Sequence, residues 1–241
     1  MPSTRRYNVA LAMAFGLAST AVIGFVAGTV IEAGAMYPLK ATAVFAVLTT
    51  AIIHVSGAQH PHSRFGPANY VTTMRVAFVA LVAGLIGFPA PAAVLWSVIG
   101  LTGVMAALDG LDGWLARRTG MASAFGARFD METDALLIFV LSVLVWQHEK
   151  AGVWVMLCGL MRYGFVAAGW LLPWLGQPLR ATWRGKAVAV GQVIGLSVAL
   201  APSVPPPVSA IAAASALAAL AWSFGIDIVW LSRQRPLQIV D

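Results

Sequence analysis

Five of the nine acidic residues in the chain lie within one stretch of 26 residues, from Asp109 to Asp134. Asp109 and Asp112 are three residues apart, and Asp130 and Asp134 are four apart. Each spacing places its two side chains on one face of a helix. A segment with small residues, 118–123, separates the two pairs. We therefore expect an antiparallel pair of helices on which four carboxylates converge.

Four converging carboxylates need positively charged partners. The stretch lies between two apolar runs of membrane length, where an ionised carboxylate costs about 2.5–3.5 kcal/mol even on the lenient insertion scale. Divalent cations offset both this cost and the repulsion between the carboxylates. Oxygen ligands select hard ions such as Mg²⁺, Mn²⁺ or Ca²⁺, and Mg²⁺ typically binds carboxylates together with substrate phosphates. The stretch therefore predicts metal-dependent phosphate chemistry at a membrane surface.

Eight residues at fixed spacing form the pattern Asp-x2-Asp-Gly-x2-Ala-Arg-x8-Gly-x3-Asp-x3-Asp. They are Asp109, Asp112, Gly113, Ala116, Arg117, Gly126, Asp130 and Asp134. The pattern resembles the signature of the CDP-alcohol phosphotransferase family (CDP-alcohol phosphatidyltransferases), and all eight positions match. Taken singly, an Asp-Gly pair usually marks a turn, and a glycine in a membrane helix usually marks close packing. Eight residues in register favour the family instead.

The resemblance implies a transferase that moves a phosphatidyl group, or another substituted phosphate group, from a CDP-alcohol such as CDP-diacylglycerol to an acceptor alcohol and releases CMP. It implies two divalent ions, Mg²⁺ or Mn²⁺, which neutralise charge on the phosphoryl oxygens. The expected metal ligands are Asp109, Asp112, Asp130 and Asp134. Asp134 is also the expected catalytic base for the acceptor hydroxyl. A homodimer is a further expectation from the family.

The family pattern also implies contacts to the cytidine diphosphate. The candidates are Asn69, Thr72, Gly113, Ala116, Arg117 and Gly126. Asn69, Thr72 and Arg75 follow one another at intervals of three, so they share a helical face. Their segment is similar to the first core helix of the family, although one residue intrudes between its proline and its asparagine. An arginine inside a span needs an anionic partner, which for Arg75 is either a motif aspartate or a substrate phosphate.

Acceptor or lipid phosphates require further basic side chains. The candidates are Arg75, Arg162, Arg180, Arg184 and Lys186. Arg162 lies well inside an apolar run and is the best of them for an anion, either acceptor phosphate or lipid phosphate. The basic cluster from Arg180 to Lys186 fits either an acceptor site or contact with anionic membrane lipids. The acceptor stays open among glycerol 3-phosphate, inositol phosphate, serine, choline and phosphatidylglycerol.

The chain as a whole has the composition of a membrane protein. Of its 241 residues, 60% are hydrophobic and only 10% are charged, which excludes an ordinary soluble domain. We predict an all-α polytopic membrane helix bundle of about eight transmembrane helices, with a six-helix family core and two N-terminal helices. The two N-terminal helices occupy residues 1–57, and the family membrane domain occupies residues 58–241.

The basic residues predict an orientation in the membrane. The expected spans are 9–31, 41–57, 67–88, 92–117, 124–146, 153–172, 187–201 and a last one that ends near 231. With the N-terminus inside, eleven Lys and Arg residues face the cytoplasm and two face outward, as the positive-inside rule requires. We expect a bacterial inner (plasma) membrane, an active site that faces the cytoplasm, and no nucleic-acid partner. Asp227, outside the motif, is expected to pair with Arg233 or Arg235.

A divalent-cation transporter is the alternative function, because carboxylates inside membrane helices also mark ion pathways. Two features of the sequence argue against it. The acidic residues gather at one end of two expected helices and do not line a path. The chain also shows no inverted repeat of the kind that many transporters have.

Overall fold

The computed structural model describes residues 2–31, 33–56, 67–119, 123–177, 179–180 and 182–234. They form α1 (Pro2–Val30), α2 (Met36–Ser56), α3 (Pro67–Gly84), α4 (Ala92–Arg118), α5 (Ala124–Gln147), the short 3-10 helix η2 (Val153–Met156), α6 (Leu157–Leu171), α7 (Trp183–Leu200) and α8 (Val208–Arg233). The prediction of an all-α protein is confirmed for this part of the chain. The predicted boundary at 57/58 lies outside the described residues.

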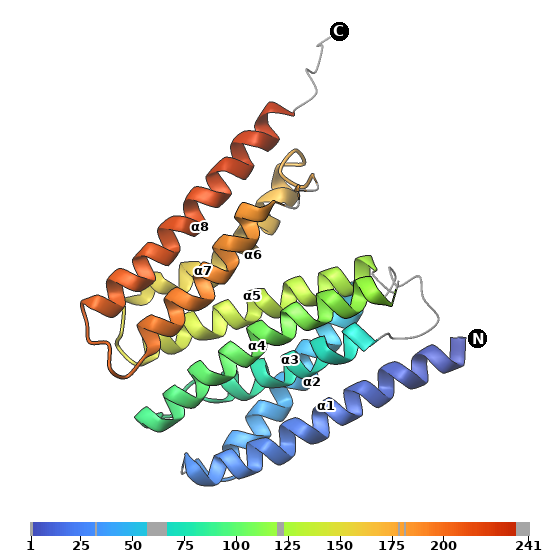
Figure 1. The fold of residues 1–241 in the computed structure, drawn as a ribbon, viewed down its shortest axis with the longest axis vertical. Helices are drawn as coiled ribbons and strands as arrows, with labels where there is room; N and C mark the ends of the chain where they lie inside the picture. Colours follow the sequence, from blue (N-terminus) through green and yellow to red (C-terminus); the bar gives the residue numbers. More distant parts are fainter. Residues whose placement is uncertain are drawn as a thin grey trace. The chain divides into compact units, whose positions relative to one another are not determined.

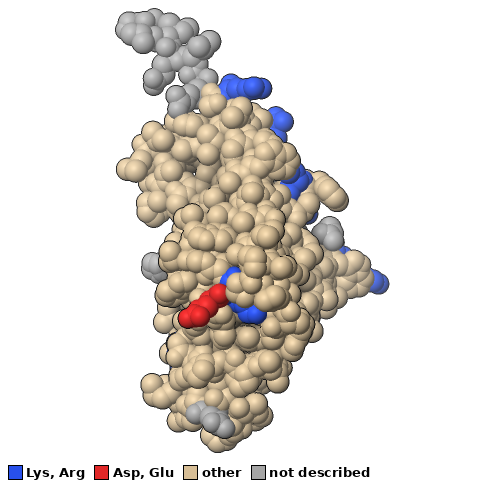
Figure 2. Space-filling view, turned by 90° about the vertical axis from the view of Figure 1, so that its left-hand side faces the viewer, with Lys and Arg blue, Asp and Glu red and all other residues tan. Residues whose placement is uncertain are grey.

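Some of the helices have the length and composition of membrane spans. Among the described residues, four stretches are long and apolar enough to cross a membrane: Ala10–Val30, Ala92–Ala116, Val153–Leu171 and Val208–Arg233. Large apolar side chains such as Phe15 and Phe25 of α1 are exposed, and uncharged residues predominate on the face drawn in Figure 2. The chain is an integral membrane protein, and the count of eight spans stays a prediction.

Two compact units divide the chain, Met1–Val140 and Leu141–Asp241. In the first unit, α1 and α2 pack on each other and on α3. Helix α4, which follows α3 in the sequence, also packs on α3 (Figure 1). In the second unit, α7 packs along α8, and α6 and η2 also contact α8. Each unit is therefore built from helices that lie next to their neighbours in sequence.

The apolar core of the first unit joins α3 to α1, α2 and the beginning of α5. Its buried members are Ala12, Phe45, Val76, Ala77, Ala80, Phe125 and Phe129. The hydroxyl of Tyr37 in α2 donates a hydrogen bond of 2.8 Å to the carbonyl oxygen of Leu81 in α3. A Cβ atom on Gly84 would lie 2.9 Å from the Tyr37 ring, so glycine allows this close approach of α2. The two N-terminal helices thus hold α3 in place.

Helix α7 begins earlier than the predicted residue 187. It starts at Trp183, and the side chain of Thr182 accepts a hydrogen bond of 3.1 Å from the backbone N–H of Gly185. This is the contact of a helix N-cap, which satisfies a backbone donor that the helix leaves free. Arg184 and Lys186 therefore lie in the first turn of α7, and the predicted start of the membrane span at residue 187 stays a prediction.

Candidate active site

The four motif aspartates meet around one arginine of α3. Asp109 and Asp112 lie on α4, and Asp130 and Asp134 lie on α5. Nη1 of Arg75 is 3.0 Å from Oδ1 of Asp109 and 2.9 Å from Oδ2 of Asp112. The same Nη1 pairs with Asp130, and Nη2 pairs with Asp134. The predicted convergence of the four carboxylates is confirmed. Arg75 was expected to face either a motif aspartate or a substrate phosphate, and in the structure it pairs with the aspartates.

This cluster is buried on one side and open on the other. Arg75 is only 1% exposed and Asp112 only 4%. The other three aspartate side chains are between 36% and 43% exposed. Four ionised carboxylates and one guanidinium carry three negative charges in excess, because 4 − 1 = 3. Charges taken out of water are stable only when well compensated, so the cluster favours the binding of additional cations on its open side.

The residues present fit a divalent metal ion. One oxygen each from Asp109, Asp112 and Asp130 lie within 4.8 Å of one another. Carboxylate oxygens are the ligands that Mg²⁺ and Mn²⁺ prefer, and the two ions differ little in this respect. Asp134 adds a fourth carboxylate that is joined to the same guanidinium. The arrangement is therefore chemically suited to hold hard cations next to an anionic substrate.

Helix α3 presents a polar face to the aspartates. The hydroxyl of Thr72 is 3.2 Å from Oδ2 of Asp112 and 3.1 Å from the carbonyl oxygen of Ala68. Asn69 and Thr72 are both buried, as is Arg75 one turn further along. Both Thr72 and Arg75 contact Asp112 of α4, and Arg75 also pairs with Asp130 of α5. The face that the spacing of three predicted is therefore turned to both helices.

A cavity of about 220 Å³ opens beside this face. It is lined by Ala68, Asn69, Thr72, Asp112, Gly113, Ala116, Ser123, Gly126, Ala127 and Asp130. Five of the six residues predicted to contact the nucleotide are among them, together with two of the aspartates. The sixth, Arg117, has a side chain that lies outside the described part of the chain. The structure thus brings the predicted contacts together around one space, and their role stays a prediction.

The beginning of α5 shapes one wall of this cavity. The hydroxyl oxygen of Ser123 accepts a hydrogen bond of 3.0 Å from the backbone N–H of Gly126, as an N-cap does. A Cβ atom on Gly126 would lie 3.1 Å from Oδ1 of Asn69, so a larger residue would require the Asn69 side chain or α5 to shift by a few tenths of an ångström. Ser123 was not predicted as a lining residue. Serine is a preferred N-cap residue, and Ser123 directly precedes the helix predicted to start at residue 124, so the sequence did indicate the cap.

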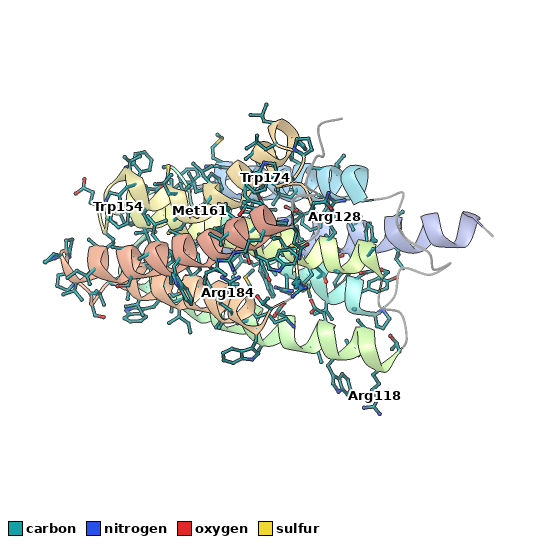
Figure 3. The ribbon with its side chains drawn as sticks, turned by 90° about the horizontal axis from the view of Figure 1, so that it is seen from above. Arg118, Arg128, Trp154, Met161, Trp174 and Arg184 are labelled. Carbon is teal, nitrogen blue, oxygen red and sulfur yellow. The ribbon has the colours of Figure 1, made fainter. Side chains whose placement is uncertain are left out.

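The remaining basic candidates belong to the second unit, where Arg180 and Arg184 have partners. The guanidinium of Arg180 lies 4.8 Å from the ring centre of Trp230. Arg184, labelled in Figure 3, donates from Nη1 to the carbonyl oxygen of Ser223 at 2.9 Å, and its Nη2 pairs with Asp227. Arg162 is half-buried on α6, and Lys186 is exposed on α7.

Asp227 has a different partner from the one predicted. The structure pairs it with Arg184, not with Arg233, and Arg235 lies outside the described residues. Arg233 is six residues further along α8, and residues six apart do not share a helical face. The earlier start of α7 instead brings Arg184 alongside α8.

Comparison with known proteins gives one consistent result. Residues 65–226 match a protein family described as CDP-alcohol phosphatidyltransferase. The CDP-diacylglycerol--glycerol-3-phosphate 3-phosphatidyltransferase of Pseudomonas fluorescens is 30% identical over 144 residues, which cover 55% of this chain and 71% of that protein. No solved structure matches the chain significantly. Helices α4 and α5, which carry the aspartates, lie wholly inside the matched range.

Proposed function

The chain belongs to the CDP-alcohol phosphatidyltransferase family, and we propose that it transfers the phosphatidyl group of CDP-diacylglycerol to glycerol 3-phosphate and releases CMP. Both comparisons support phosphatidyl transfer in phospholipid synthesis. The donor and acceptor proposed here are those in the name of the Pseudomonas fluorescens relative. The observation that carries the proposal is the convergence of the four motif aspartates on Arg75 beside the cavity.

In the proposed reaction, the acceptor oxygen forms a new bond to phosphorus while the bond from phosphorus to the oxygen of the CMP group breaks. Asp109, Asp112, Asp130 and Asp134 would hold two Mg²⁺ or Mn²⁺ ions. When bound, these ions would neutralise charge on the transferred and leaving phosphate oxygens. Asp134 takes the proton of the acceptor hydroxyl as general base. Its side chain is 38% exposed, which leaves it accessible to a small alcohol.

The cavity is proposed to hold the cytidine diphosphate. Gly113 and Ala116 of α4 and Gly126 of α5 leave room for the nucleotide, because they carry little or no side chain. Asn69 and Thr72 add polar contacts from α3. Arg117, also in the family pattern, would pair with the phosphates of the nucleotide.

Basic residues are proposed to bind the acceptor or lipid phosphates. They are Arg75, Arg162, Arg180, Arg184 and Lys186. Arg75 and Arg184 already pair with aspartates, so a phosphate would have to compete with these carboxylates for either guanidinium. We further propose a bacterial inner (plasma) membrane and a cytoplasmic active site, on the eleven-to-two distribution of basic residues, and a homodimer, on the family resemblance.

The reaction can be tested with purified protein in detergent. The assay measures CMP release from CDP-diacylglycerol with Mg²⁺ or Mn²⁺, and it adds one acceptor alcohol at a time. We expect release with glycerol 3-phosphate. If only a different alcohol gives release, the proposed acceptor is wrong and the proposed phosphatidyl transfer stands. If no alcohol gives release and CDP-diacylglycerol shows no metal-dependent binding, the transferase proposal fails.

The proposed base can be tested by Asp134→Asn. The substitution keeps the size of the side chain and removes its ability to take a proton, so CMP release should fall by about 10²–10⁴-fold while CDP-diacylglycerol still binds. Glu132→Gln is the matched control. Glu132 lies on the same helix, two residues away and off the carboxylate face, and its variant should keep near-normal activity. Full activity of Asp134→Asn would exclude the proposed role.

The comparisons give no support to the alternative of a divalent-cation transporter. The two functions predict different behaviour in proteoliposomes. A transferase should show no metal flux when nucleotide is absent. Steady Mn²⁺ flux without nucleotide would favour the transporter.

A further inference from the structure

Arg75 binds the carboxylates that a divalent cation would need. Its Nη1 is 3.0 Å from Asp109 and 2.9 Å from Asp112, and it also pairs with Asp130. These are the three residues whose oxygens lie within 4.8 Å of one another. We propose that Arg75 is an internal counter-cation that holds the motif carboxylates together before metal binds and competes with divalent metal for them. This inference rests on the proposed metal site.

Burial explains why such a counter-cation is needed. Arg75 is 1% exposed and Asp112 is 4% exposed, so water screens this pair poorly. Without a positive charge among them, the four carboxylates would repel one another, and either Arg75 or a bound metal ion can supply that charge. Arg75 supplies that charge from a third helix, α3, which the N-terminal helices hold in place through Tyr37. The site can therefore remain assembled without metal.

The charge balance explains why metal can displace the arginine. One guanidinium leaves three negative charges in excess among the four aspartates, because 4 − 1 = 3. A divalent ion brings twice the charge in a smaller volume and binds carboxylate oxygens directly. Its arrival neutralises more of the cluster than Arg75 does. Nη1 then loses at least part of its contact with Asp109, Asp112 and Asp130.

One nitrogen of the Arg75 guanidinium, Nε, takes no part in the pairing with the aspartates. Its Nε is buried and has no hydrogen-bond partner among the described residues. A buried N–H without an acceptor is unfavourable, and such groups in folded proteins usually have a partner. A phosphate oxygen would provide one. A guanidinium released by metal therefore remains a suitable donor for the phosphates proposed to bind here.

A different role for Arg75 would give the opposite result in metal binding. If Arg75 were only a structural support that orients the carboxylates for metal, its removal would weaken metal binding. If it competes with metal, its removal strengthens metal binding. The sign of the change in Mn²⁺ affinity therefore separates the two roles.

The experiment measures binding of Mn²⁺ alone, by electron paramagnetic resonance, to the full-length protein in detergent without nucleotide. For Arg75→Gln we expect the Mn²⁺ concentration at half-saturation to fall by about tenfold or more, because a unit positive charge is removed from direct contact with the ligands. Arg118→Gln removes the same charge from the end of α4. There the side chain is exposed, lies over the Trp114 ring at 4.8 Å and points away from the helices (Figure 3). This control should change the midpoint by less than about twofold.

Each outcome decides the inference. Equal or weaker Mn²⁺ binding by Arg75→Gln, with wild-type binding intact, overturns the competition and leaves the proposed function standing. Absence of Mn²⁺ binding by both proteins overturns the metal site as well.

A second measurement follows metal binding in the wild-type protein, so its result does not depend on the metal binding of a variant. In wild-type protein with ¹⁵N-labelled arginine, the guanidinium signal of Arg75, identified by its loss in Arg75→Lys, should shift when diamagnetic Mg²⁺ is added. An unchanged signal at saturating Mg²⁺ would overturn the inference.

Discussion

Each unit of the molecule contains a buried or half-buried arginine with acidic partners, and the two arginines are used differently. In the first unit, Arg75 is shared by four aspartates, and three negative charges are in excess. In the second unit, Arg184 pairs with the single carboxylate of Asp227, so the charges balance. The side chains of Arg184 and Asp227 are 19% and 24% exposed, whereas that of Arg75 is 2% exposed.

The difference between the two regions is one of charge balance, and the excess of negative charge distinguishes the candidate active site from the pair in the second unit. Ionisable residues in membrane helices usually pair with each other or line functional sites. Asp227 does the former, because it ties α8 to the first turn of α7 through Arg184. The aspartates around Arg75 have more negative charge than the described residues neutralise. Such a cluster gains stability when cations bind, and this is the property that metal-dependent catalysis requires.

The largest expected effect is the loss of activity in Asp112→Asn, with the same substitution at Asp227 in the second unit as its comparison. Asp112→Asn removes a proposed metal ligand that also binds Arg75 and Thr72, so CMP release should fall by more than about 10²-fold. Asp227→Asn makes the same chemical change in the balanced pair. It should keep kcat within about twofold at a temperature where the protein stays folded. Steady-state CMP release by both variants measures the contrast.

Two results would contradict this contrast. Near-normal activity of Asp112→Asn would show that the unbalanced cluster is not the metal site. A comparable loss in Asp227→Asn, in protein that retains its thermal transition, would show that the balanced pair also takes part in the reaction.

An intermediate effect is expected on stability when the balanced pair is broken. Arg184→Gln or Asp227→Asn alone leaves a half-buried charge without its partner, so the apparent free energy of unfolding in detergent should fall by about 1–3 kcal/mol. The double variant removes both charges and should recover part of this loss. A double-mutant cycle of thermal or denaturant unfolding measures the coupling. Additive effects of the two substitutions would mean that the pair contributes nothing to stability.

The smallest expected effect concerns the hydroxyl of Thr72. Thr72→Val removes the donor to Asp112, but the single hydroxyl hydrogen is shared with the carbonyl oxygen of Ala68 and both contacts are long, at 3.2 and 3.1 Å. The loss should therefore be about 0.5–1.5 kcal/mol, or roughly 2–10-fold in kcat/KM. Thr73→Val is the matched control, because the hydroxyl of Thr73 donates only to the carbonyl oxygen of Asn69 among the contacts found, at 2.8 Å. Equal activity of the two variants would show that the contact of Thr72 with Asp112 is not used in the reaction.

The sequence by itself determined the class of fold and the placing of the four aspartates as two pairs, each on one helical face. Residues three and four apart share a helical face whatever the rest of the chain does, so Asp109, Asp112, Asp130 and Asp134 could be placed from their spacing alone. The same rule placed Asn69, Thr72 and Arg75 on one side of α3. High hydrophobic content with few charges gave an all-α membrane protein, because only helices satisfy the backbone locally in lipid when no barrel pattern is present.

Only the tertiary structure decided which groups meet across helices. Arg75 could have faced a substrate phosphate, and it pairs with aspartates up to 59 residues away along the chain. Asp227 could have paired within α8, and it pairs with Arg184, 43 residues earlier. Such choices depend on how each helix is rotated about its axis and shifted along it. In the first unit these choices accompany the packing of a core that contains Phe45, Val76 and Phe129, and the spacing of residues within one helix carries no information about such packing.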